Sequence, residues 1–395
     1  MGRCEQVRFG KVLWLVLDSV GVGAMPDAAA YGDAGADTLG HTASFVGGLH
    51  MPNLGRLGLG SLHPVMGVPP VASPDGHFAR LAEASPGKDT TTGHWEMAGV
   101  VLDHAFVTFP HGFPAEVMDA FRRESGFDWV GNTTASGTEI IARLGEEHQR
   151  TGRLIVYTSA DSVFQVAAHE ETVPLDRLYA ACEVARRILD PLHVARVIAR
   201  PFVGVPGAYH RTYNRRDFSV VPPRDTVLDL LLAAGVRVVG VGKIHDIFAG
   251  RGVGESIHTE GNTDGLARTE AALRAMDAGL VMTNLVDFDM LYGHRRDAAG
   301  YARALEEVDA FLPRLLDAVG PSGLVLITAD HGCDPTAKWS TDHTREYIPL
   351  IAWHPGIRPG EGRDLGTRKT FADIGQSVAS NFAVGPLAAG TALDL

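Results

Sequence analysis

The stretch Lys11–Leu17, KVLWLVL, with Asp18 directly after it, decides the fold. Every residue after Lys11 in this run is apolar, so both faces of the strand would be buried, which favours a strand inside a parallel sheet. Other apolar runs also end beside a polar residue: they are residues 235–242 before Lys243, 280–286 before Asp287, and 324–328 close to Asp330. The pattern predicts neighbouring strands with polar side chains at their carboxyl ends.

Helical patterns alternate with these runs. Residues 225–234 and 264–278 each stop at a glycine, and residues 301–319 carry an apolar stripe at helical spacing. Alternating strands and helices predict an α/β fold with a doubly wound, mainly parallel sheet. In such a fold, ligands bind beyond the carboxyl ends of the strands.

The middle of the chain has its own elements. It contains strand candidates at 154–157 and 196–199 and a helix candidate at 176–189, and it ends near the Pro-rich stretch 221–223. Pro-rich connections often mark domain boundaries. We therefore expect an inserted α/β cap domain at 104–222, within a core domain made of residues 1–103 and 223–395.

Composition excludes several classes of protein. The 395 residues carry 35 basic and 47 acidic side chains, a net charge of −12, without a basic block, which argues against nucleic acid and anionic membranes as partners. No apolar run approaches the roughly 18 residues that span a bilayer. Cys4, Cys182 and Cys333 are odd in number and far apart, as expected of reduced thiols. We expect a cytoplasmic protein.

Carboxylates and imidazoles follow the apolar runs in four short phrases, VLDSVG, DFDMLYGH, TADHG and TDHT. The candidate ligands are Asp18, Asp289, His294, Asp330, His331 and His343. Together these groups suit divalent ions such as Mn²⁺ or Zn²⁺ and predict two metal sites. Taken singly, Asp18 could cap a turn and His294 could be a surface histidine. Asp287 is an alternative to Asp289, because strand alternation would place both on one face.

The phrase GKDTTTGHWEMAG, residues 87–99, places Thr90, Thr91 and Thr92 where a loop enters a predicted helix. A threonine there could be a helix N-cap, and the N–H groups at such an end also stabilise phosphate. A threonine hydroxyl needs activation, which a divalent cation could supply. Three carboxylates and two divalent cations leave a charge of about +1 to face a phosphoryl group.

At these residues the sequence resembles the phosphopentomutases, a family of the alkaline phosphatase superfamily. The resemblance runs through nearly the whole chain, in segments that include VLDSVGVGAMPDA, GKDTTTGHWEMAG, YTSADSVFQVAAHEE, RVIARPFVG, NLVDFDMLYGHRRD, TADHG and TDHTREYIPL. It implies an alkaline-phosphatase-like core with an inserted cap. Together these segments are highly specific, whereas TADHG alone would indicate only the superfamily.

The resemblance also implies roles for individual residues. It implies two Mn²⁺ ions, one held by Asp289, His294 and His343 and the other by Asp18, Asp330 and His331. Thr90 would carry the phosphate. Arg200, Arg215 and Lys243 would hold the sugar phosphate, and Ser159 and Asp161 would lie near the pentose hydroxyls. Arg211 and Arg216 are expected to be solvated surface residues, and Cys333 receives no role.

The implied reaction interconverts ribose 1-phosphate and ribose 5-phosphate, and the 2-deoxyribose pair, through a phosphothreonine and a bisphosphate intermediate. A sugar bisphosphate would be the activator. The expected partners are small sugar phosphates, with no obligate protein partner. The alternatives are a phosphatase or a cofactor-independent phosphoglycerate mutase on the same core, and a metal-stabilised binding protein without turnover.

Overall fold

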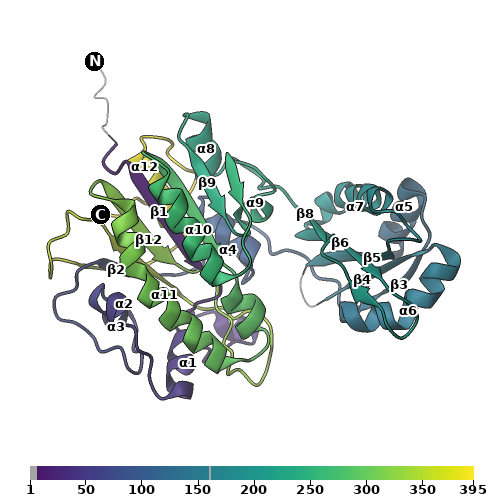
Figure 1. Cartoon of the computed structure of the whole chain (residues 1–395), viewed down its shortest axis with the longest axis horizontal. Helices are drawn as coiled ribbons and strands as arrows, with labels where there is room; N and C mark the ends of the chain where they lie inside the picture. The colour runs from purple at the N-terminus through teal and green to yellow at the C-terminus, as the bar shows by residue number, and fades with distance from the viewer. Residues whose placement is uncertain (1–6, 160–161) are drawn as a thin grey trace. The chain divides into compact units, whose positions relative to one another are not determined.

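The computed structural model describes residues 7–159 and 162–395. The chain forms two compact units, which are coloured along the chain in Figure 1. The larger unit combines the N-terminal part of the chain, up to His104, with everything from Pro222 onward, and the smaller unit is Ala105–Val221. Each unit has its own sheet.

The larger unit contains an eight-stranded sheet in the order β10-β9-β11-β1-β12-β13-β2-β14. Strands β10, β9, β11, β1 and β12 are parallel to one another, β13 is antiparallel to both β12 and β2, and β14 is parallel to β2. The strands are β1 (Lys11–Leu17), β2 (His77–Leu81), β9 (Val238–Val241), β10 (Glu255–Ile257), β11 (Gly279–Leu285), β12 (Gly323–Thr328), β13 (Ile348–Trp353) and β14 (Asp364–Arg368).

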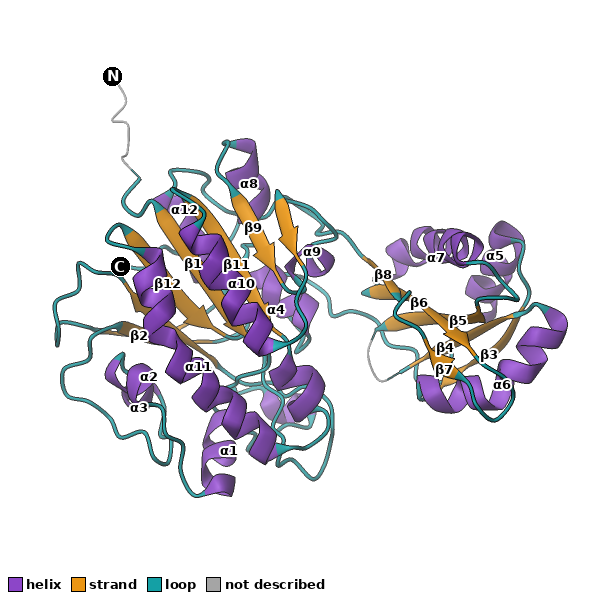
Figure 2. Cartoon of the chain, viewed as in Figure 1, coloured by secondary structure: helices purple, strands orange, loops and turns teal. Residues whose placement is uncertain are grey.

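Helices cover both faces of this sheet (Figure 2). Helices α1, α10 and α11 pack together against one face, and α4, α8, α9 and α12 form a second connected group. The helices of this unit are α1 (Thr38–Val46), α2 (Pro52–Arg56), α3 (Leu59–Leu62), α4 (Thr90–Met97), α8 (Val227–Ala233), α9 (Ile244–Ile247), α10 (Asn262–Arg274), α11 (Ala298–Val319) and α12 (Ala372–Asn381), with a 3-10 turn η1 (Ala28–Tyr31) and a π-helix η3 (Phe288–Gly293).

The doubly wound, mainly parallel sheet predicted from the sequence is confirmed. Strands β1, β11 and β12 coincide with the apolar runs within one residue, because they are buried on both faces and contain almost no polar interruption. The predicted strand 235–242 is shorter, since Gly235 adopts a left-handed conformation that ends the turn after α8. The antiparallel β13 was not anticipated.

The smaller unit has a six-stranded mixed sheet in which β3, β4, β5, β6 and β7 follow one another and β8 also pairs with β6. Its elements are α5 (Ala115–Ser125), β3 (Trp129–Thr134), α6 (Gly137–Thr151), β4 (Leu154–Thr158), β5 (Val163–His169), α7 (Leu175–Leu189), η2 (Asp190–Leu192), β6 (Arg196–Val203), β7 (His210–Arg211) and β8 (Arg216–Ser219). Separate apolar clusters lie on the two sheet faces, one with α5 and α7 and the other with α6.

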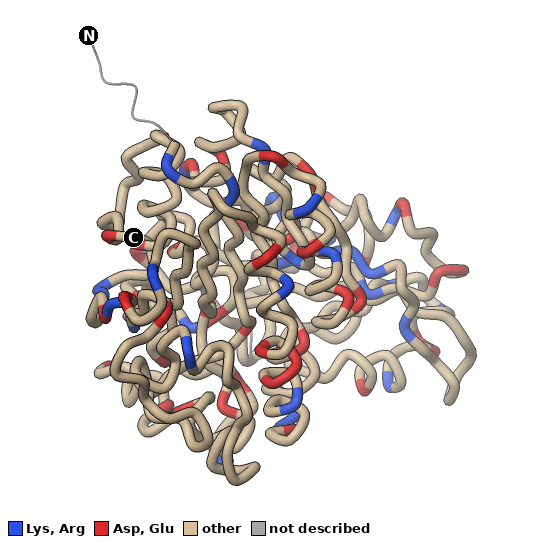
Figure 3. The backbone as a smooth tube through the Cα atoms, turned by 60° about the vertical axis from the view of Figure 1, so that its left-hand side comes forward, with Lys and Arg blue, Asp and Glu red and all other residues tan. Residues whose placement is uncertain are grey.

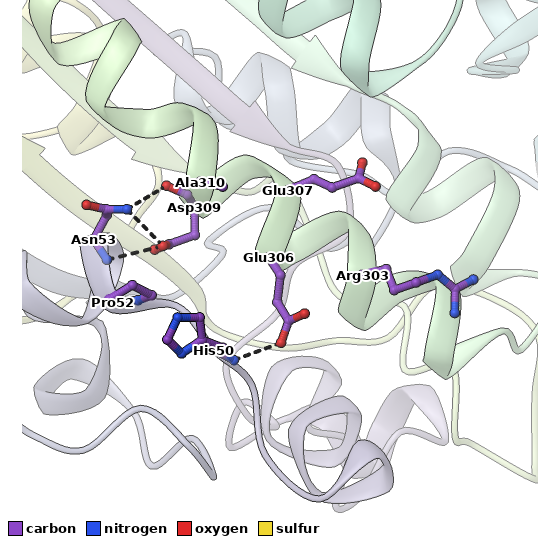
Figure 4. Close-up of a pocket in the computed structure, with 8 residues that line it drawn as sticks. All are labelled: His50, Pro52, Asn53, Arg303, Glu306, Glu307, Asp309 and Ala310. Carbon is purple, nitrogen blue, oxygen red and sulfur yellow. Dashed lines mark hydrogen bonds between the residues drawn. The ribbon is translucent and has the colours of Figure 1, made fainter.

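A buried carboxylate joins α2 to α11. The N-cap position of α2 offers no side-chain bond, and Asp309 of α11 instead accepts hydrogen bonds from the backbone N–H groups of Asn53 and Leu54 (Figure 4). The Asn53 amide also donates to Asp309, and Glu306 accepts from the N–H of His50. These bonds satisfy the N-terminal donors of α2 and fix it to the long helix.

Figure 3 shows basic and acidic residues in both units of the chain. No helix within the described residues combines the length and the apolar character needed to cross a bilayer.

Candidate active site

The carboxyl ends of three adjacent parallel strands carry most of the candidate ligands. Asp18 follows β1 directly, Asp330 and His331 follow β12, and Asp289 lies in the π-helix just after β11. Because β1 lies between β11 and β12, these ends meet at one edge of the sheet. His343 is supplied by the loop before β13.

The structure groups the candidate ligands into two overlapping sets. Ligand atoms of Asp289, His294 and His343 lie within 4.8 Å of one another, and so do those of Asp18, Asp289 and His331. The Nε2 atom of His294 lies 3.3 Å from Asp289 Oδ2, and that of His343 lies 3.4 Å from Asp289 Oδ1. Five of the six candidate ligands are in these two sets, with Asp289 in both.

Asp330 joins the second set through His331. Its Oδ2 lies 3.3 Å from His331 Nε2, and the same nitrogen lies 3.5 Å from Asp18 Oδ1. The other oxygen, Oδ1, accepts a 2.9 Å hydrogen bond from the N–H of Ser19, a residue held at a φ of 75°. The turn after β1 therefore fixes Asp330 as well as presenting Asp18.

The oxygen atoms of this cluster fit divalent cations. Asp18 Oδ1, Asp289 Oδ1 and Asp330 Oδ2 are buried and accept no hydrogen bond from the described residues. A buried carboxylate oxygen without a partner is costly, and a cation would supply the missing interaction. Mixed carboxylate and imidazole ligands suit Mn²⁺ and Zn²⁺.

The electrostatics of Asp18 point the same way. Burial, followed by the neighbouring charges of Asp330 and Asp289, raises the pKa of Asp18 well above its usual value. Burial opposes ionisation of Asp289 too, but His343 and His294 hold its pKa well below the usual value. Burial also acts against protonation of His294, yet its bond to Asp289 raises the pKa of this imidazole to about 12. Closely spaced like charges are stabilised by positive charge between them.

Thr90 contacts this cluster. Its Oγ1 lies 3.1 Å from His331 Nε2, although the two residues are 241 positions apart. Thr90 is the first residue of α4, and the N-cap is Asp89, whose Oδ1 accepts from the N–H groups of Thr91 and Thr92. The interpretation of a threonine as the N-cap is therefore wrong, because the aspartate one residue earlier provides the oxygen.

Asp287 lies outside the cluster. It accepts a 2.7 Å hydrogen bond from the N–H of Asn262, at the start of α10. Strand alternation does not apply here, because β11 ends at Leu285 and the chain then enters the π-helix that contains Asp289. This change of backbone conformation separates the two carboxylates.

Helix α4 approaches the end of β12 very closely. A Cβ atom at Gly93 would lie 2.1 Å from the carbonyl oxygen of Asp330, so only glycine fits.

His94, one turn after Thr90, contacts both the helix and the cluster. Its Nδ1 lies 2.9 Å from the Thr90 carbonyl oxygen and 3.2 Å from Asp330 Oδ2. Asn284 of β11 lies 3.3 Å from His94 Nε2 and donates to Asp18 Oδ2.

Sequence reasoning did not assign His94, Asn284, Glu96 or Arg345. Glu96 is buried on α4 and accepts hydrogen bonds from the backbone N–H groups of Ala84, Ser85 and Phe371. The only sequence signal for His94 and Glu96 was their position on the helix of Thr90, within the quoted phrase.

The predicted substrate residues divide between the two units. In the larger unit, Lys243 follows β9 and is near enough to Asp18 to lower the pKa of that carboxyl. In the smaller unit, Ser159 follows β4, and Arg200 of β6 donates through Nε to Gln165. Burial, and then the charge of Arg215, lowers the pKa of Arg200 to about 10. Asp161 lies outside the described residues.

Arg215 is exposed and donates to both carboxylate oxygens of Asp217, at 2.7 and 2.6 Å. Burial raises the pKa of Asp217, but this bidentate pair outweighs it and the net shift is downward.

The buried thiol of Cys333 is beside His294, and burial raises the pKa of this thiol to about 12.

Comparisons with known proteins identify the family of the chain. The metalloenzyme superfamily model matches residues 10–386. The chain is 64% identical over 375 residues to a phosphopentomutase from Anaeromyxobacter sp. (strain K), an alignment that covers 95% of this chain and 96% of the relative. It is 55% identical to a phosphopentomutase from Desulfitobacterium hafniense (strain DSM 10664 / DCB-2), covering 93% and 95% of the two chains.

Among solved structures, a phosphoglycerate mutase from Leishmania mexicana has a TM-score of 0.50 at 14% identity, with 99% of this chain and 98% of that chain covered. This likeness shows the shared fold alone. The high identity and coverage of the sequence relatives show the family of the chain as well as its fold. The matching superfamily is one of metal-dependent enzymes. The chain therefore belongs to the phosphopentomutase family of the metalloenzyme superfamily.

Proposed function

We propose that this chain interconverts ribose 1-phosphate and ribose 5-phosphate, and the 2-deoxyribose equivalents, with Thr90 as the residue that carries the phosphoryl group. Membership of the phosphopentomutase family supports the reaction type, an isomerisation. The observation that carries the role of Thr90 is the 3.1 Å contact between its Oγ1 and Nε2 of His331, within the cluster of buried carboxylates.

In the proposed cycle, phosphothreonine 90 donates its phosphoryl group to the free hydroxyl of the sugar monophosphate. The bond between phosphorus and Thr90 Oγ1 breaks, a bond to the sugar oxygen forms, and a 1,5-bisphosphate results. The threonine oxygen regains a proton as the sugar hydroxyl loses one. The phosphate that the substrate brought is then transferred from the bisphosphate to Thr90. The enzyme therefore ends the cycle phosphorylated.

We assign two Mn²⁺ ions to the cluster, one with Asp289, His294 and His343, and one with Asp18, Asp330 and His331. When bound, such ions lower the pKa of a hydroxyl and neutralise charge on a transferring phosphoryl group. The protein's own contribution is positional. Asp89 caps the helix of Thr90, and Nδ1 of His94 lies 2.9 Å from the Thr90 carbonyl oxygen and 3.2 Å from Asp330 Oδ2.

For the substrate we assign Arg200, Arg215 and Lys243 to the sugar phosphate and Ser159 and Asp161 to the pentose hydroxyls. Guanidinium groups suit phosphate because they donate two parallel hydrogen bonds. An unphosphorylated enzyme needs a phosphoryl donor to enter the cycle, and we propose a sugar bisphosphate as this activator.

The test uses ribose 1-phosphate, Mn²⁺ and a trace of a sugar bisphosphate, with ribose 5-phosphate and inorganic phosphate measured together. We expect ribose 5-phosphate to form with little free phosphate. Release of inorganic phosphate without ribose 5-phosphate would identify a phosphatase instead. Absence of both products, with ligand still bound, would identify a binding protein.

A second measurement locates the phosphate. The protein is incubated with the bisphosphate, and its intact mass and peptides are analysed by mass spectrometry. We expect one added phosphate within the peptide that contains residues 87–99, on Thr90. Phosphate on any other residue would contradict the assignment.

A further inference from the structure

We propose that Tyr301 is a positioning residue for the metal cluster. Its hydroxyl holds Ser19, and through Ser19 the whole turn after β1, in the conformation that orients the carboxylates of Asp18 and Asp330. The inference rests on the proposed metal sites. It concerns two side chains, those of Tyr301 and Ser19, to which the sequence motifs assign no role.

Ser19 has an unusual backbone conformation. It follows Asp18 directly in the turn after β1, and its φ is 75° although it carries a side chain. A Cβ atom makes this left-handed region unfavourable, so a residue stays there only when its surroundings hold it. The turn that presents Asp18 therefore depends on the contacts of Ser19.

Two contacts hold Ser19 in place. Its backbone N–H donates a 2.9 Å hydrogen bond to Asp330 Oδ1, and its Oγ lies 3.2 Å from the hydroxyl of Tyr301. Both Ser19 and Tyr301 are fully buried. Because buried hydroxyl groups need hydrogen-bond partners, the second contact ties the turn to helix α11.

Tyr301 is itself fixed against the segments that bear the cluster. It lies in the first turn of α11, which packs against β1 and β12 (Figure 1). A Cβ atom at Gly300 would clash with the ring of Tyr292, so α11 begins in close contact with the π-helix. The ring of Tyr301 packs on that of Phe288, the residue before Asp289, with the ring centroids 5.3 Å apart. Tyr301 thus contacts both the turn after β1 and the π-helix of Asp289.

The hydroxyl of Tyr301 acts as a neutral group. Burial raises the pKa of Tyr301 well above its usual value, and the contact with Ser19 offsets this only in part. The hydroxyl therefore keeps its proton and adds no negative charge to a cluster that already contains three carboxylates. Its effect on the cluster is through the position of Ser19.

The bond from Ser19 determines which oxygen of Asp330 faces the cluster. Oδ1 accepts the N–H of Ser19, and this leaves Oδ2 at 3.3 Å from Nε2 of His331. Hydrogen bonds of this kind orient metal-binding carboxylates, and their loss typically costs about 10–100-fold in metal affinity or activity. If Ser19 relaxed to an ordinary φ, Asp330 would lose this orientation and the neighbouring Asp18 would shift with the turn.

The test measures Mn²⁺ affinity without substrate. Metal-free full-length protein is titrated with Mn²⁺, and the free ion is followed by electron paramagnetic resonance. Y301F removes only the tyrosine hydroxyl, and S19A removes only the serine Oγ. Each should weaken the binding of one Mn²⁺ ion about ten-fold. The double variant should bind no more weakly than either single variant, because both changes break the same contact.

Two further variants separate positioning from a general loss of structure. Y209F removes a tyrosine hydroxyl that bonds to Gln149 in the smaller unit, and it should leave Mn²⁺ affinity unchanged. S19G should bind Mn²⁺ more tightly than S19A, since glycine adopts a positive φ without steric cost.

Kinetics give a second readout. The kcat of Y301F should fall at limiting Mn²⁺ and recover at saturating Mn²⁺, whereas its KM for ribose 1-phosphate should stay unchanged. A purely structural role of Tyr301 would lower the melting temperature of the metal-free protein without this dependence on Mn²⁺.

Unchanged Mn²⁺ affinity in Y301F and S19A would overturn the inference, and so would losses that simply add in the double variant. An S19G protein that binds no better than S19A would also overturn it, because the strained turn would then have no part in binding. If the unaltered protein bound no Mn²⁺, the proposed metal sites would be wrong and this inference with them. Normal binding by the unaltered protein, with no change in the variants, would contradict this inference alone.

Discussion

The guanidinium group of Arg345 donates a 2.6 Å hydrogen bond to the carbonyl oxygen of Gly87, three residues before Thr90. The same group bonds to the carbonyls of Ser85 and Glu83 and to the carboxylate of Glu83. Arg345 lies two residues after His343 and is almost fully buried. One side chain therefore fixes the loop of the proposed phosphate carrier to the segment that bears a proposed metal ligand.

We expect the substitution Arg345→Met to destabilise the protein by about 3–5 kcal/mol, because it leaves the buried carboxylate of Glu83 without its partner. It should also lower kcat, since the loop before Thr90 loses several of its anchors. Urea unfolding and steady-state kinetics measure the two effects. Arg358→Met is the control: Arg358 is exposed and its loss should change stability by under about 0.5 kcal/mol. Equal effects of the two substitutions would contradict the role given to Arg345.

Replacing Thr90 by valine removes the hydroxyl while keeping the shape of the side chain. We expect isomerase activity to fall by at least about 10³-fold, because the variant lacks the hydroxyl that we propose as the phosphoryl carrier. The protein should also take up no phosphate from a sugar bisphosphate in an intact-mass measurement. Thr91→Val makes the same chemical change one residue along α4 and should retain uptake. Phosphorylation of the Thr90→Val protein would refute the assignment.

Removal of metal should affect both activity and stability. The three buried carboxylates of the cluster repel one another without cations, so chelation should abolish isomerisation and lower the melting temperature. Restoring Mn²⁺ at about 1,000 times its Kd should return about 4 kcal/mol of stability, by mass action. Differential scanning fluorimetry follows the melting temperature, and the formation of ribose 5-phosphate from ribose 1-phosphate follows the activity. A protein that stays active after exhaustive chelation would exclude the metal assignment.

His77 should make the protein sensitive to mild acid. Burial, and then the nearby charge of Arg363, lowers the pKa of His77 to about 4, whereas the unfolded chain has the ordinary value of about 6.5. Between these values the unfolded state binds the proton and the folded state does not. His77 therefore reduces stability as pH falls from about 6.5 to about 4, by up to about 1.4 kcal/mol per pH unit.

Urea unfolding at pH 7.5, 5.5 and 4.5 tests this effect by comparing the protein with its His77→Gln variant. The variant should lose less stability toward low pH, because it cannot take up the proton on unfolding. His50→Gln, at an exposed position, is the control and should follow the unaltered protein. Parallel loss of stability in all three proteins would show that His77 does not contribute.

Much of the fold followed from local patterns. Strands such as β1 and β12 were predicted almost to the residue, because burial on both faces demands an uninterrupted apolar run. β13 was not predicted, although its sequence IPLIAW is apolar. Its antiparallel direction depends on pairing with β2 and β12, which the sequence of the strand does not record. The candidate ligands were found by their position after the apolar runs.

The sequence by itself determined which side chains follow the strands of a parallel sheet, and its motifs determined the family. Only the tertiary structure decided which groups touch: Thr90 with His331, Arg345 with Gly87, and Tyr301 with Ser19. All three pairs join residues more than 200 positions apart. Hydrophobic periodicity is a local property that sequence carries directly. A contact between distant residues exists only once the intervening chain has folded, so no local pattern records it.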